Sequence, residues 1–191
     1  MNKKFEYFLN AVHYCLWLGE IKSSDFIGRI IDKLLSPVPK YLFSKKYREK
    51  YEKRLPETQK EMEWIFNDKE NGVNIGSANH WFGFFYSGYP CFLSFVLCGI
   101  VFGLFGAVNP IVTLAICVLP IGLCYIPAYK AVFTKNRYLK YFKQFEKEDE
   151  QWHKKWKWIT IAFVIGSEVF TIGGIFAMSG ICLFFRGEYI E

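Results

Sequence analysis

The sequence predicts an all-α integral membrane protein with three transmembrane helices, arranged as a helical hairpin plus one further helix. First, residues 81–129 contain no Asp, Glu, Lys or Arg. One crossing of a bilayer core needs about 20 apolar residues, so this run is long enough for two. Second, Asn109-Pro110 is a turn signal that divides the run into spans at 82–106 and 110–133. Third, a further apolar run covers 156–185, where Lys157 and Glu168 are the only charged residues.

The rest of the chain is charged and is expected to be helical. Residues 5–18 are apolar with polar side chains on one side, but they are too few to span a bilayer comfortably. We expect this helix either to lie in the membrane interface or to pack on the rest of the N-terminal region. Further helices are expected to start at Ser-Ser-Asp, residues 23–25, and at Pro56.

The connection after the hairpin should reverse near residues 148–150, with Asn136 as the alternative position. These boundaries divide the chain into five parts. They are a helical, membrane-associated cytoplasmic region (1–78), the transmembrane hairpin (79–134), an amphipathic cytoplasmic connection (135–155), the third transmembrane helix (156–185) and a short external tail (186–191).

The distribution of basic residues predicts the orientation. Residues 1–80 carry 14 Lys and Arg and residues 130–157 carry nine, whereas the turn at 107–110 carries none and the tail carries only Arg186. The positive-inside rule therefore places the N-terminus in the cytoplasm and the C-terminus outside. Four tryptophans then fall at the cytoplasmic interface, where amphipathic rings are favoured as anchors: Trp81, Trp152, Trp156 and Trp158.

The same distribution explains the net charge of +6. The basic segments contain interleaved aromatic residues and flank the spans, so we expect them to contact the lipid bilayer and its anionic lipids rather than nucleic acid. No cleavable signal peptide is evident, and the six cysteines form no CxxC pair. Both features are compatible with a bacterial inner membrane.

Glycines recur at helical spacing on the first and third spans. Small residues allow close approach between helices in lipid, so these faces are expected to pack, either within one chain or along an oligomer seam. The predicted packing residues are Gly88, Gly99, Gly103 and Gly106 on the first span, and Gly166, Gly173 and Gly180 on the third.

Glu168 is a candidate intramembrane polar site, because an ionisable side chain within a span is costly. At about 100° per residue it lies nearly opposite the predicted glycine face, on the side of Thr171 and Ser179. Pro120, at similar depth on the second span, frees the carbonyl of Ile116, which Glu168 could contact. A conducting or ion-binding role and a purely structural interhelical role both remain open.

Catalytic and metal-binding signatures are absent from the sequence. His13, His80 and His153 are dispersed, and no HExxH, GxSxG, phosphate-binding or dinucleotide-binding motif occurs. We therefore expect no enzyme, metal or cofactor. The preferred interpretation is a membrane-bound assembly or interaction component that forms a homo-oligomer or binds a membrane protein partner. The alternatives are an oligomeric pore or channel subunit and, less favoured, a small transporter.

Overall fold

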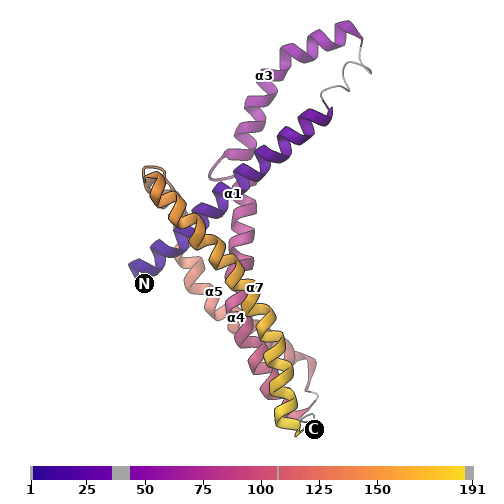
Figure 1. The fold of residues 1–191 in the computed structure, drawn as a ribbon, viewed down its shortest axis with the longest axis vertical. Helices are drawn as coiled ribbons and strands as arrows, with labels where there is room; N and C mark the ends of the chain where they lie inside the picture. The colour runs from indigo at the N-terminus through magenta and orange to yellow at the C-terminus, as the bar shows by residue number, and fades with distance from the viewer. Residues whose placement is uncertain (1, 36–43, 107, 188–191) are drawn as a thin grey trace. The chain divides into compact units, whose positions relative to one another are not determined.

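The computed structural model describes residues 2–35, 44–106 and 108–187, and every element in these ranges is a helix (Figure 1). Ala107 and most of the predicted external tail lie outside them. The elements are α1 (Lys3–Leu35), α3 (Lys45–Asn67), α4 (Val73–Phe105), α5 (Pro110–Val132), the 3-10 helix η1 (Thr134–Asn136), α6 (Arg137–Phe145) and α7 (Glu150–Arg186).

Three helices are long and apolar enough to span a membrane, which confirms the predicted fold class. They are α4, α5 with its continuation to Phe145, and α7. The Asn-Pro signal acts as predicted: Asn109 Oδ1 accepts a hydrogen bond of 2.8 Å from the Ile111 amide, and Pro110 begins α5. At the other side of the turn, Gly106 has φ +70°, a conformation that favours glycine.

The chain divides into two compact units. Unit 1 contains Met1–Cys15 and Trp81–Glu191, and unit 2 contains Leu16–His80. Both α1 and α4 contribute to each unit.

In unit 1, α4 contacts both α5 and α7, and the three helices run alongside one another (Figure 1). The residues of α4 that face α7 recur around Gly88, Phe92 and Gly99. The residues that face α5 include Ser94 and Cys98. At about 100° per residue, these two faces of α4 lie roughly 120° apart. α4 therefore packs on α5 with one face and on α7 with another.

An aromatic cap completes unit 1, built from the first part of α1, the end of α5, α6 and the start of α7. The side chains of residues 9–14 of α1 are all buried. The polar side of this helix faces inward, since Asn10 and His13 are fully buried. The first part of α1 therefore packs on the spans and on α6 rather than on the rest of the N-terminal region, and its position at a membrane interface stays a prediction. Periodicity marks the polar side of a helix without identifying what covers it.

Unit 2 corrects two predicted helix starts. Residues 23–25 lie within the continuous helix α1, and the Ser24 hydroxyl donates to Asn74 Oδ1 at 2.6 Å. Asn74 in turn donates to Asn67 Oδ1 at 2.9 Å, which joins α4 to the end of α3. Pro56 lies inside α3 rather than at its start, on the exposed side of the helix, where solvent can satisfy the carbonyl that proline frees.

Both positions considered for the reversal after the hairpin are breaks in the helix. Lys135 and Asn136 have φ of 56° and 51°, so the backbone bends between α5 and α6. The chain then turns after Phe145 and enters α7 at Glu150. Asp149 caps α7 by accepting a hydrogen bond of 2.7 Å from the Trp152 amide.

Candidate functional site

The contact between α4 and α7 depends on glycines. A Cβ on Gly99 would lie 2.8 Å from the Met178 carbonyl oxygen, and a Cβ on Gly103 would lie 2.7 Å from the Phe185 Cβ. A Cβ on Gly88 would collide with the Ser167 hydroxyl. These three predicted glycines therefore lie where the two helices approach most closely, as small residues allow in lipid.

The third span packs on α4 through one predicted glycine, Gly166, and through Gly174, which was not predicted. A Cβ on Gly174 would meet Phe95 at 2.8 Å, whereas Gly173 and Gly180 have no atom within 4 Å of such a Cβ. Gly166 lies beside the Tyr89 ring, with the hydroxyl 2.8 Å from its Cβ position. Ser167 and Gly174 are seven residues apart, a spacing of small residues that places both on one side of α7. A role for Gly173 and Gly180 in an oligomer seam stays a prediction.

The contact between α4 and α5 is hydrogen-bonded at two prolines. The Ser94 hydroxyl donates to the Cys117 carbonyl at 2.9 Å, three residues before Pro120. The Tyr86 hydroxyl donates to the Cys124 carbonyl at 3.2 Å, three residues before Pro127. Each proline frees the carbonyl four residues before it, that of Ile116 or Leu123, so both bonds go to the carbonyl next to the freed one. Beside the first bond, the sulfur atoms of Cys98 and Cys117 lie 3.6 Å apart.

The polar residues predicted around Glu168 do not form one site. Thr171 donates to the Ser167 carbonyl at 2.9 Å and Ser179 donates to the Ile175 carbonyl at 3.2 Å, both within α7. Glu168 is exposed on α7. Within the described ranges, no hydrogen bond joins it to α5, the helix that carries Pro120.

The aromatic cap contains buried polar groups from the first part of α1. The His13 ring lies 5.4–5.5 Å from four aromatic rings. Asn10 Nδ2 donates to the carbonyls of Glu6 and Ala131 at 2.8 and 3.1 Å, and Glu6 pairs with Arg137 at 3.3 Å. The cap comprises Tyr7, His13, Tyr14, Phe82, Phe133, Tyr138, Phe142, Phe145, Trp152 and Trp156.

Burial within the cap perturbs one ionisable group. The pKa of Tyr14 is raised to about 12, chiefly because burial disfavours the phenolate and secondly because Glu146 repels its negative charge. The neutral hydroxyl is therefore the form suited to the folded cap.

The four predicted tryptophan anchors occupy two kinds of position. Trp152 stacks on Phe145 at 4.8 Å and donates from Nε1 to the Tyr7 hydroxyl at 2.9 Å. Trp156 is also packed in the cap. Trp81 and Trp158 are 40% and 62% exposed, so their rings remain available to a lipid interface.

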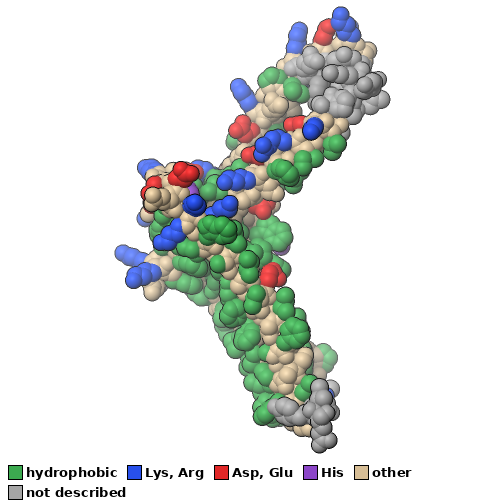
Figure 2. All heavy atoms as spheres, in the orientation of Figure 1, with side chains coloured by type: hydrophobic (Ala, Val, Ile, Leu, Met, Phe, Trp, Pro, Cys, Tyr) green, Lys and Arg blue, Asp and Glu red, His purple; other side chains and the backbone are tan. Residues whose placement is uncertain are grey.

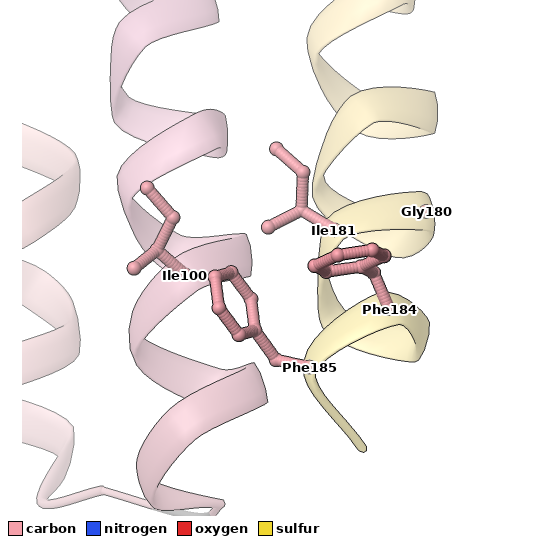
Figure 3. Close-up of a pocket in the computed structure, with 5 residues that line it drawn as sticks. All are labelled: Ile100, Gly180, Ile181, Phe184 and Phe185. Carbon is pink, nitrogen blue, oxygen red and sulfur yellow. The ribbon is translucent and has the colours of Figure 1, made fainter. Parts of the chain in front are cut away.

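Two of the spans enclose an open apolar hollow between them. An open apolar groove of about 470 Å³ lies between α4 and α7, lined by Ile100, Gly180, Ile181, Phe184 and Phe185 (Figure 3). No group of three or more His, Cys, Asp or Glu side chains in these ranges is placed to hold a metal ion.

Unit 2 exposes large apolar side chains outside the spans. Those on α3 are Met62, Trp64 and Ile65. Those on α1, which we name the α1 stripe, are Phe26, Ile27, Ile30, Ile31 and Leu34. Figure 2 shows hydrophobic and basic side chains close together on this part of α1.

No protein-family model, curated protein or solved structure matches this chain.

Proposed function

We propose that this protein is a non-enzymatic component of a membrane-bound assembly. Its three apolar helices anchor it in the bilayer, and unit 2 supplies the surface that binds a second copy or a membrane protein partner. The observation that carries the proposal is the exposure of large apolar side chains outside the spans. Trp64 is 69% exposed and Phe26 is 60% exposed. Gathered apolar side chains of this kind mark interaction surfaces.

The packing of unit 1 supports an anchoring role. The hydroxyls of Tyr86, Tyr89 and Ser94 on α4 all donate to backbone carbonyls of the neighbouring helices. Three such bonds, together with glycine contacts, hold α5 and α7 to α4 on both sides. Polar groups of the spans therefore join the helices to one another.

The charge distribution supports an orientation with the N-terminus and unit 2 in the cytoplasm and the C-terminus outside. The 14 basic residues before residue 81 and the nine at 130–157 then lie on one side of the membrane. Anionic lipids of that leaflet are the expected lipid partners.

The mass of the native particle tests the proposal. The protein is extracted from its own membranes in lipid nanodiscs, and the protein mass per particle is compared with the 22.5 kDa of one chain. We expect a larger mass for the wild type and a smaller one for Trp64→Glu, because a charge at an apolar contact disfavours binding. The control is Glu63→Gln, a neighbouring exposed change. A single chain per particle in the wild type would overturn the proposal.

A pore subunit is the second candidate, favoured by Glu168. Its carboxyl lies on the exposed surface of a span, where several copies could bring such groups together. Ion flux into liposomes distinguishes the candidates. The assembly proposal predicts no flux above protein-free liposomes, whereas a pore that uses Glu168 predicts flux that Glu168→Gln abolishes in an intact assembly.

A further inference from the structure

We infer that the α1 stripe docks on an anionic membrane surface. The apolar side chains of the stripe lie together on one side of α1. At about 100° per residue, its five apolar side chains cover an arc of roughly 140°. Phe26 lies at one margin of this arc and Ile31 at the other, with Leu34 near the middle. The stripe therefore forms one continuous apolar face over the last turns of α1.

Basic residues adjoin one margin of the stripe. Lys22, Arg29 and Lys33 are all exposed and lie about 20–60° beyond Phe26 on the same wheel. We name them the basic edge. Asp25 and Asp32 lie about 180° from the middle of the stripe, on the opposite side of the helix. The positive charge is thus beside the apolar face and the negative charge is directed away from it.

This arrangement fits the boundary of an anionic leaflet. An interfacial helix inserts its apolar face among the acyl chains while Lys and Arg contact the lipid phosphates. Ser24, two residues before the stripe, bonds to Asn74 of α4, and the charge-free run of the sequence begins seven residues after Asn74, at Trp81. A membrane surface presents acyl chains to the apolar side chains and phosphates to the basic edge along the whole length of the stripe.

The inference rests on the proposed role of unit 2 as an interaction part and assigns one of its two exposed apolar surfaces to lipid. The α3 side chains Met62, Trp64 and Ile65 remain for a protein partner. Failure of lipid docking leaves the particle-mass result unaffected, so the two proposals can fail separately.

Hydrogen exchange of the intact protein in nanodiscs tests the inference. One chain per disc is compared in phosphatidylcholine alone and in discs where phosphatidylglycerol replaces part of it. We expect the amides of residues 22–35 to exchange more slowly in the anionic discs, and added salt to remove the difference. At the usual strength of a Lys or Arg near an anionic surface, three of them change the ratio of docked to undocked states by about a hundredfold.

Two variants and a matched control locate the effect. Charge reversal of the basic edge (Lys22→Glu, Arg29→Glu, Lys33→Glu) should abolish the slower exchange in anionic discs. The double variant Ile30→Gln, Leu34→Gln keeps the basic edge and should reduce this slowing. The control reverses three exposed lysines on α3 (Lys50→Glu, Lys53→Glu, Lys60→Glu) and should retain it. Unchanged exchange of the α7 peptides verifies folding. The inference would be overturned if the wild type exchanged equally in both kinds of disc, or if the α3 control lost the protection. It would also be overturned if protection appeared only with two chains per disc, because the stripe would then bind a second copy.

Discussion

The hydroxyl of Ser94 on α4 donates a hydrogen bond of 2.9 Å to the carbonyl of Cys117 on α5, three residues before Pro120. The carbonyl that Pro120 frees is that of Ile116, one residue before Cys117, so the bond lies beside the break in the backbone bonding of α5. It joins α4 to α5 at that depth.

Removal of this hydroxyl should destabilise the protein modestly. We expect Ser94→Ala to lower the free energy of unfolding by about 0.6 kcal/mol, and by at most about 1.7 kcal/mol, the measured range for interhelical bonds in membranes. Thermal unfolding in detergent measures the effect. The control is Ser179→Ala, since Ser179 bonds only to Ile175 of its own helix on an exposed face. Equal effects of the two substitutions would contradict the assignment.

Two glycines of the spans should respond differently to the same substitution. Gly99→Leu places a side chain against the backbone of Met178, 2.8 Å from its carbonyl oxygen, so α4 and α7 must separate and folding should fail. Gly173→Leu meets open space within the chain and should leave thermal stability nearly unchanged. If Gly173 lines an oligomer seam, the particle mass falls without unfolding. A folded, fully stable Gly99→Leu protein would refute the close contact.

The aromatic cap should weaken at alkaline pH. Because the pKa of Tyr14 is raised from 10.0 to about 12, the folded state favours the neutral phenol. This contribution to stability is complete below pH 10 and is lost as the pH rises towards about 12. Stability measured across that window should therefore fall more steeply for wild type than for Tyr14→Phe. Parallel profiles would show that Tyr14 does not titrate in this way.

The orientation can be read with fused reporters. A reporter after Glu191 should be external, and reporters inserted near Asn71 and Glu148 should be cytoplasmic, because basic residues gather on that side. A cytoplasmic reporter at the C-terminus would indicate an even number of crossings.

The sequence by itself determined the number of spans and the turn between the first two. A long run without charged residues must be removed from water, whatever the rest of the chain does. Asn109 and Pro110 start a helix by local effects, a side-chain cap and a fixed backbone angle. Local signals were weaker elsewhere, since Pro56 and the serines at 23–24 lie inside helices. The free energy of a single cap or proline is small beside that of the packing of a whole helix.

Only the tertiary structure decided which faces of these helices are covered. Gly166, Gly173 and Gly180 form one line on α7, yet of these three only Gly166 lies against α4, and Ser167 and Gly174 make the other close contacts. A close approach depends on the shape of both helices. Asn10 and His13 likewise marked one side of α1, and their burial depends on α4, α5 and α6, which lie more than sixty residues away in the chain. Periodicity identifies a distinct side of a helix, and the partner that covers it is set by long-range packing.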